Sequence, residues 1–108
     1  MHAVNSVSIV LPTLNEAESL PHVLRAIPSG IALEVLVVDG GSTDGTPALA
    51  IAGGARVVAE PRRGYGRACQ SGLEAARGEI VVFLDADGAD DPAALPDLLA
   101  PLLAGRTD

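Results

Sequence analysis

Four short runs rich in β-branched residues alternate along this chain with four longer segments of helical character. The predicted strands cover residues 7–11, 34–38, 56–59 and 80–84. The predicted helices cover residues 18–27, a segment that begins at Thr46, residues 65–77, and a segment from Asp91 to about Ala104. Only a few residues connect each pair of elements, and strand–helix–strand connections are right-handed. The order therefore predicts an α/β fold, an open doubly wound and mostly parallel sheet with helices on both faces.

The length and composition fit one compact domain that spans residues 1–108. Hydrophobic residues make up 48% of the chain, yet Tyr65 and Phe83 are its only aromatic side chains. The core must therefore consist of Val, Leu, Ile and Ala, which is typical of helices packed on a parallel sheet.

The charge balance excludes several classes of function. A formal net charge of −7 repels nucleic acid and anionic membrane surfaces, so we expect no nucleic-acid partner. The chain has no lysine, which excludes Schiff-base chemistry and a P-loop lysine, and its single Cys69 cannot form an internal disulfide. No signal peptide is visible at the N-terminus, and no apolar run reaches the roughly 18 residues of a membrane span, so we expect a cytoplasmic protein.

Polar, acidic and glycine-rich residues follow every predicted strand. These strand exits are residues 12–16, 39–46, 60–67 and 85–91. Because the carboxyl ends of parallel strands meet at one edge of the sheet, the four exits converge there, where ligands of such sheets bind. Turn formation alone explains glycines such as Gly40, Gly41 and Gly45, but it does not explain Asp85 and Asp87.

Asp85 and Asp87 directly follow an apolar run that fits a central strand. Their like charges, one residue apart, repel each other unless a cation lies beside them. Oxygen ligands of this kind suit Mg²⁺ or Mn²⁺, which bridge one or two carboxylates to the phosphates of a substrate. We interpret the pair as a metal site, and a polar turn is the alternative.

Three of the seven arginines, Arg62, Arg63 and Arg67, lie around Gly64 at the predicted start of the third helix. Guanidinium groups and backbone N–H groups at a helix start can bind a diphosphate. The alternative is an exposed arginine surface that pairs with nearby acids. Asp39 ends the second predicted strand, where an acidic residue can contact a ribose or base or can simply cap a turn.

Three motifs in this order resemble the inverting glycosyltransferases of family 2, and most of all their dolichol- and polyprenyl-phosphate branch. Residues 7–16 resemble the opening strand with its Pro-x-x-Asn-Glu turn, residues 37–46 resemble the second-strand signature, and residues 83–87 resemble the Asp-x-Asp metal motif. The resemblance covers nearly the whole chain. It implies the Rossmann-like half of a glycosyltransferase A fold.

The resemblance also implies roles for individual residues. Those expected to bind the nucleotide sugar, a UDP- or GDP-linked donor, are Pro12, Leu14, Glu16, Asp39, Arg63, Gly64, Arg67, Asp85 and Ala86. Asp85 and Asp87 would hold Mg²⁺ or Mn²⁺ on the diphosphate, so that Asp87 acts in catalysis through the metal. The acceptor implied is a polyprenyl phosphate, which would place the full-length protein at the inner face of the membrane.

In this family the general base belongs to the second half of the domain. We therefore expect the chain to be a C-terminally truncated, nucleotide-sugar-binding half without transfer activity of its own. An uncovered sheet edge would favour self-association. Two other classes of protein share some of these features. A phosphoacceptor signalling domain requires a lysine that is absent, whereas a non-catalytic nucleotide-sugar-binding module stays open.

Overall fold

The structure, a computed structural model, describes residues 6–105 and the side chains of residues 6–100. Its strands are β1 (Val7–Thr13), β2 (Glu34–Asp39), β3 (Arg56–Ala59) and β4 (Ile80–Phe83). They form one sheet in the order β3-β2-β1-β4, and every neighbouring pair is parallel. The helices are α1 (Leu20–Ala26), α2 (Thr46–Ala52), α3 (Tyr65–Ala75) and α4 (Leu95–Gly105), with a 3₁₀ turn, η1 (Pro92–Ala94), before α4. The predicted fold class is confirmed.

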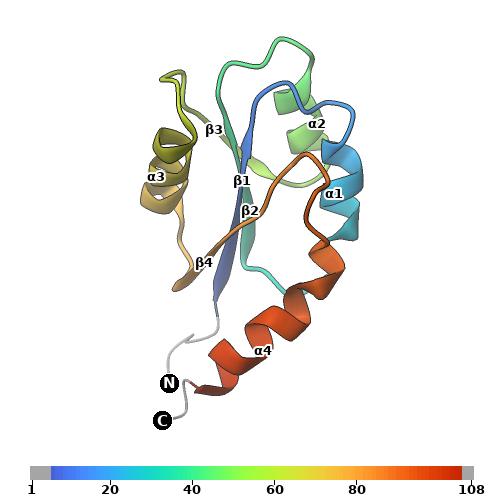
Figure 1. The fold of residues 1–108 in the computed structure, drawn as a ribbon, viewed down its shortest axis with the longest axis vertical. Coiled ribbons are helices and arrows are strands. Elements are labelled where there is room, and N and C mark those ends of the chain that lie inside the picture. The colour runs from blue at the N-terminus through green and yellow to red at the C-terminus, as the bar shows by residue number, and fades with distance from the viewer. Residues whose placement is uncertain (1–5, 106–108) are drawn as a thin grey trace.

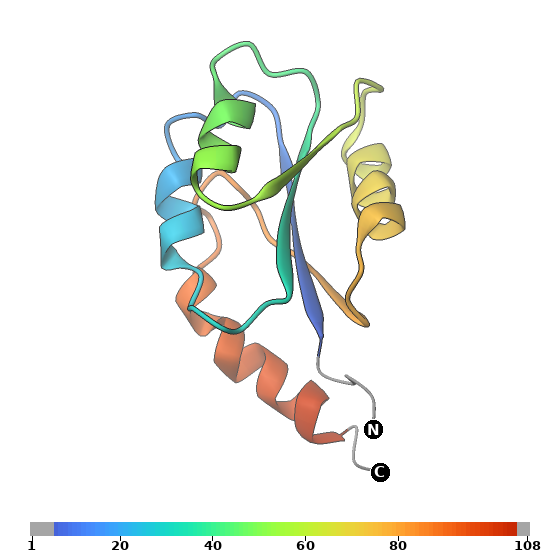
Figure 2. The ribbon, with the colours of Figure 1, turned by 180° about the vertical axis from the view of Figure 1, so that it is seen from behind.

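The sheet separates two helical layers. Helix α3 lies on one face, and α1, α2 and α4 lie on the other (Figures 1 and 2). Alternate side chains of a strand point to opposite faces, so Ile9 and Leu11 of β1 join the cluster under α1, α2 and α4. Val10 instead joins Leu36 and Val38 in a smaller cluster under α3. Helices on both faces are what the alternating pattern of elements predicts.

Helix α3 approaches the sheet closely at one glycine. Gly72 is buried, and a Cβ atom added there would lie 2.4 Å from Cγ1 of Val10 and 3.2 Å from Cγ2 of Val38. Real Cβ atoms essentially never approach a neighbour as closely as the contact with Val10 would require. The absence of a side chain at position 72 therefore sets how near the helix lies to β1 and β2.

The last turn of the third predicted helix is replaced by an extended connection. Helix α3 ends at Ala75, although the sequence predicts a helix to Arg77. The amide of Arg77 donates to the Glu34 carboxylate at 2.6 Å, and the amide of Gly78 donates to the Ser8 hydroxyl at 2.8 Å. Because side chains of β1 and β2 take these two amides, the helix ends earlier.

Two helix starts also differ from the sequence prediction. Helix α1 begins at Leu20 and not at Glu18, with Pro21 in its first turn. The segment from Asp91 begins as η1, where the Asp91 side chain accepts from the amide of Ala93 at 3.0 Å, and continues as α4. The helical segment therefore begins at the residue that the cap-then-proline signal predicts, although its first turn is a 3₁₀ turn and not an α-helical one.

The strand order reverses between β1 and β4. From β1 the chain proceeds to β2 and β3, and it then crosses to β4 on the other side of β1. In open α/β sheets ligands bind beyond the carboxyl ends of the strands at such a point. The register pairs Thr13 with Asp39 and Val10 with Phe83, so the exits of β1, β2 and β4 lie at the same edge.

Among residues 6–105, no helix has the length and apolarity needed to cross a membrane.

Candidate functional site

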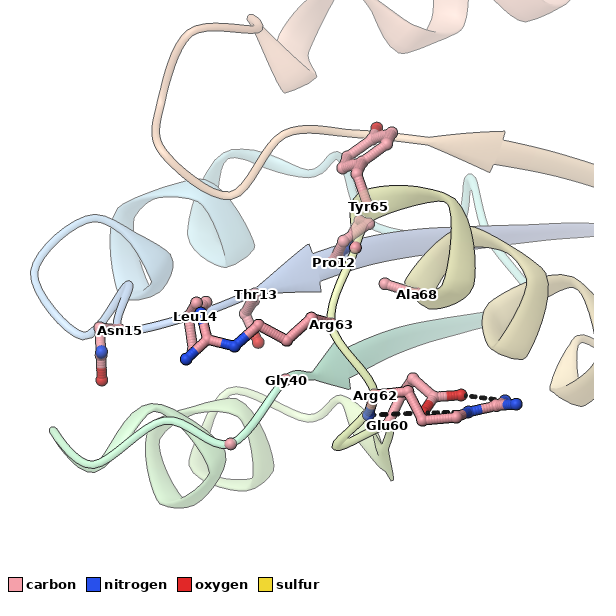
Figure 3. A pocket seen from close by; sticks show the side chains of 12 residues that line it. Pro12, Thr13, Leu14, Asn15, Gly40, Glu60, Arg62, Arg63, Tyr65 and Ala68 are labelled. Carbon is pink, nitrogen blue, oxygen red and sulfur yellow. Dashed lines mark hydrogen bonds and ion pairs between the residues drawn. The ribbon is translucent and has the colours of Figure 1, made fainter.

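A pocket of about 550 Å³ opens at the carboxyl ends of β1, β2 and β3, beside the start of α3 (Figure 3). We call it the strand-end pocket. It is lined by residues 12–15, Gly40, Gly41, Glu60, residues 62–65 and Ala68. Four of the predicted binding residues, Pro12, Leu14, Arg63 and Gly64, therefore meet in one cavity. Glu16, Asp39, Arg67, Asp85, Ala86 and Asp87 lie outside its lining.

Hydrogen bonds join the loop after β1 to the loop after β2. Asn15 has a positive φ of 55°. Its amide donates to the Ser42 hydroxyl at 2.7 Å, and its side-chain oxygen accepts from the Thr43 amide at 2.9 Å. The next amide, that of Glu16, donates to the Thr46 hydroxyl at 3.0 Å. Asn tolerates this left-handed backbone better than most residues, and the turn is held in place before any ligand binds.

The carboxylate of Asp39 is buried beneath the pocket and fully engaged. One oxygen accepts from the hydroxyls of Thr13 at 2.8 Å and Ser42 at 2.6 Å. The other accepts from the amides of Gly41 at 3.1 Å and Ser42 at 2.8 Å. Burial raises the pKa of Asp39, but the hydrogen bonds from Ser42, Thr13 and Gly41 outweigh it and hold the pKa below its usual value. Asp39 thus organises the turn after β2, and its predicted contact with a base or ribose stays a prediction.

Glu60 and Arg62 form a second engaged pair at the pocket wall. The Arg62 guanidinium lies 2.6 Å from one carboxylate oxygen of Glu60, and its Nε and backbone N lie 3.0 Å from the other. Hydrogen bonds from Arg62 and Ser71 hold the pKa of Glu60 far below its usual range. For Arg62 the structure therefore shows the acid-paired arrangement and not a free phosphate ligand.

Arg63 and Arg67 remain available near the start of α3. Among residues 6–105, neither side chain forms an ion pair. The Arg63 side chain extends toward Leu14, whereas Arg62 turns away to Glu60 (Figure 3). Gly64 precedes the helix with φ 116°, a conformation that favours glycine. Two uncommitted guanidinium groups at a helix start suit a diphosphate.

The loop after β4 carries the acidic pair and is fixed in place. Asp85 is half-buried, Ala86 is buried and Asp87 is exposed. The Ser19 hydroxyl donates to the carbonyl oxygen of Ala86 at 2.6 Å, which ties this loop to the start of α1. The amide of Asp85 donates to the side chain of Asp90 at 2.9 Å. These two contacts hold the backbone of the acidic pair at the edge where β1 and β4 end.

The ionisation of Glu16 is affected by the negative charge of the loop after β4. Burial raises the pKa of Glu16, and the charges of Asp87, Asp44 and Asp85 raise it further. The Asp85 and Asp87 carboxylates therefore come close enough to Glu16 for their repulsion to matter. The structure in this way brings together three predicted site residues that come from two separate loops.

Tyr65, at the start of α3, is also affected by negative charge in the loop after β4. Burial raises the pKa of Tyr65, as do a hydrogen bond with Cys69 and the charges of Asp85 and Asp90. Tyr65 is one of the residues that line the strand-end pocket. Tyr65 is therefore a pocket residue that lies near the charges of the acidic loop.

A divalent cation fits the donor set of the acidic loop only if a substrate completes its coordination. Within the described part of the chain, no group of three or more His, Cys, Asp or Glu side chains is arranged to hold a metal ion. Asp85 and Asp87 would supply two hard oxygen ligands. Mg²⁺ and Mn²⁺ are bound in this manner where phosphates and water provide the remaining ligands.

Sequence reasoning missed three residues that shape the site. Glu60 is buried with its charge engaged, Tyr65 lines the pocket, and Ser19 holds the acidic loop. The contact of Ser19 joins positions 67 residues apart, so no local pattern could reveal it. The only sequence signal for Glu60 was an acidic residue two positions before Arg62.

Comparison with known proteins identifies the family. Residues 8–108 match the model of glycosyl transferase family 2. Over 103 residues the chain is 52% identical to a protein of Mycobacterium tuberculosis described as an uncharacterised glycosyltransferase, which covers 95% of this chain and 46% of that protein. It is 41% identical over 113 residues to glucosyl-3-phosphoglycerate synthase of Mycolicibacterium smegmatis, covering 94% of this chain and 37% of that one.

Solved structures agree with this match. The crystal structure of glucosyl-3-phosphoglycerate synthase from Mycobacterium tuberculosis with Mn²⁺, UDP and glucosyl-3-phosphoglycerate superposes with a TM-score of 0.81 at 40% identity. That alignment covers 92% of this chain and 40% of the other. The chain thus spans less than half the length of each of these relatives. With the family model matched over nearly its whole length, the chain belongs to glycosyl transferase family 2.

Proposed function

We propose that this chain is the donor-binding half of a UDP-sugar-dependent glycosyltransferase. One observation carries the proposal: the strand-end pocket and the acidic pair lie at the same edge of the sheet, in a fold that matches a UDP- and Mn²⁺-bound relative with a TM-score of 0.81. A relative of the same name has also been crystallised with Mn²⁺ and UDP-glucose. Both complexes contain uridine nucleotides, whereas the sequence left UDP and GDP open.

In the proposed complex, three parts of the site each contact a different part of the nucleotide sugar. Pro12, Leu14, Glu16 and Asp39 would surround the base and ribose, with Asp39 acting through the turn that it organises. Arg63, Gly64 and Arg67 would approach the diphosphate. Asp85, Ala86 and Asp87 would lie at the junction of diphosphate and sugar. Asp85 and Asp87 would hold the divalent ion, which, when bound, neutralises charge on the departing diphosphate.

The proposed reaction is a direct displacement with inversion at the anomeric carbon. The acceptor oxygen forms a bond to that carbon, the bond from the carbon to the diphosphate oxygen breaks, and its electron pair leaves with UDP. The acceptor proton passes to a general base. In this chain Arg63 and Arg67 would stabilise the departing diphosphate, and we place the base in sequence beyond Asp108.

For the acceptor we propose a small phosphorylated acid. The relatives named glucosyl-3-phosphoglycerate synthase support this class, and structures of one of them contain phosphoglyceric acid. The resemblance to the polyprenyl-phosphate branch implied a lipid phosphate instead. Both acceptors present a phosphate, so the experiment includes both.

The test is release of UDP from UDP-glucose with Mn²⁺, with 3-phosphoglycerate or polyprenyl phosphate as acceptor. We expect the 108-residue chain to bind UDP-glucose without acceptor-dependent turnover, and a polypeptide extended to the length of the relatives to turn over with phosphoglycerate. Turnover with polyprenyl phosphate alone would overturn the acceptor assignment. Binding without turnover by the extended polypeptide would support a non-catalytic binding module and contradict the proposed enzyme.

A further inference from the structure

The polar side chains that line the strand-end pocket are nearly all engaged within the protein. Glu60 is paired with Arg62, and the side-chain oxygen of Asn15 accepts from Thr43. Thr13, which also lines the pocket, donates to Asp39. Among the described lining residues, Arg63 is the charged group without an ion pair. The pocket therefore offers few side-chain groups that could distinguish one base from another.

Position 40 is one of the lining positions of the strand-end pocket, and there the chain has glycine. Gly40 lines the pocket directly after Asp39. A Cβ atom added to Gly40 would lie 3.5 Å from the Thr13 carbonyl oxygen, 3.9 Å from the Glu60 carbonyl oxygen and 3.9 Å from a Leu14 methyl group. These are ordinary contacts, and Gly40 does not have the positive φ that favours glycine. Nothing in the backbone thus requires glycine, and its effect is to leave this part of the pocket open.

We propose that Gly40 determines base specificity, and that its missing side chain lets the pocket accept purine as well as pyrimidine nucleoside diphosphates. The inference rests on the proposed function and concerns the same site. Strong discrimination between bases requires a buried polar group that the wrong base leaves unpaired. Asp39 is already satisfied by four hydrogen bonds, and position 40 supplies no such group.

Two side chains at the mouth of the strand-end pocket, those of Leu14 and Arg63, can also contact a purine or a pyrimidine base. Leu14 is half exposed and presents an apolar surface, on which the face of any base can lie. A guanidinium such as that of Arg63 can stack on any base and can donate to its acceptor atoms. Neither side chain favours a pyrimidine over a purine.

The test is calorimetric titration of the 108-residue chain with UDP, CDP, GDP and ADP in the presence of Mn²⁺. We expect the dissociation constants of the parent for UDP and GDP to differ by less than about tenfold, the scale that a single good contact provides. Gly40→Ser should weaken GDP and ADP binding by more than about tenfold while changing UDP binding several-fold less, because its side chain enters space that the larger base needs.

Two further variants keep the result interpretable. Gly40→Ala, the smaller change, should shift the preference in the same direction if the serine variant does not fold. Ala52→Ser, exposed at the end of α2 and outside the pocket, should leave all four affinities unchanged. If the parent chain binds UDP more than tenfold more tightly than GDP, the inference about Gly40 is wrong, but the proposed function stands. The same conclusion follows if Gly40→Ser weakens the binding of UDP and of GDP equally. Failure to bind any of the four nucleotides overturns the proposed function together with it.

Discussion

Asn in place of Asp87 is expected to abolish the Mn²⁺-dependent part of UDP binding. The substitution removes a hard anionic ligand and conserves the shape of the side chain. Asp87 is exposed, and its carboxylate accepts from the amide of Ala89 at 2.9 Å, a contact that an asparagine oxygen can keep, so the loop should survive the change. We expect the affinity for UDP in the presence of Mn²⁺ to fall by about tenfold to a hundredfold, to the value without metal, and somewhat less for Asp85→Asn.

Titration of UDP with and without Mn²⁺ measures this effect directly. Asp97→Asn is the matched control, because Asp97 is an exposed aspartate in the first turn of α4 and lies outside the site. The control should keep the metal-dependent affinity of the parent. If Asp85→Asn and Asp87→Asn also keep it, the acidic pair is not the metal site.

The second large effect concerns stability. Gly72→Ala should lower the free energy of unfolding by about 1–3 kcal/mol, because the new methyl group would overpack the contact between α3 and the sheet. Its Cβ would meet Val10 at 2.4 Å, and both residues are buried. Urea unfolding followed by circular dichroism provides the measurement.

Gly66→Ala in the same helix separates overpacking from helix propensity. A Cβ at Gly66 has no neighbour within 4 Å, so alanine there should raise the free energy of unfolding by about 0.5–1 kcal/mol. Opposite signs at the two positions are expected. Equal effects of both substitutions would mean that α3 does not lie on the sheet at Gly72.

The sequence predicts the fold class and the four strands because both depend on local patterns. Strand β3 has the predicted bounds, while β1 extends two residues beyond the prediction and β2 one. The end of α3 could not be predicted, since it depends on Ser8 and Glu34, which are distant in sequence. Local sequence propensity does not predict a helix boundary that depends on hydrogen bonds to distant parts of the chain.

The candidate site shows the same division. Convergence of the strand exits follows from the parallel order, and the structure confirms it for the strand-end pocket. Which side chains are already engaged depends on distances that the sequence does not contain, as Arg62 and Asp39 show. The self-association expected at an uncovered edge also stays a prediction, although β4 ends the sheet on one side and Phe83 is exposed there.

The central claim is that UDP and a divalent ion bind together at the carboxyl edge of this sheet. Nuclear magnetic resonance of the ¹⁵N-labelled chain tests it most directly, because Mn²⁺ is paramagnetic and broadens the signals of nearby amides. We predict that UDP shifts the amides of residues 13–15, 40–41 and 62–65, and that Mn²⁺ added with UDP broadens Asp85, Ala86, Asp87 and Glu16 most. Broadening centred on the opposite edge of the sheet, for example near Glu79, with the strand-end pocket unshifted, would contradict the account.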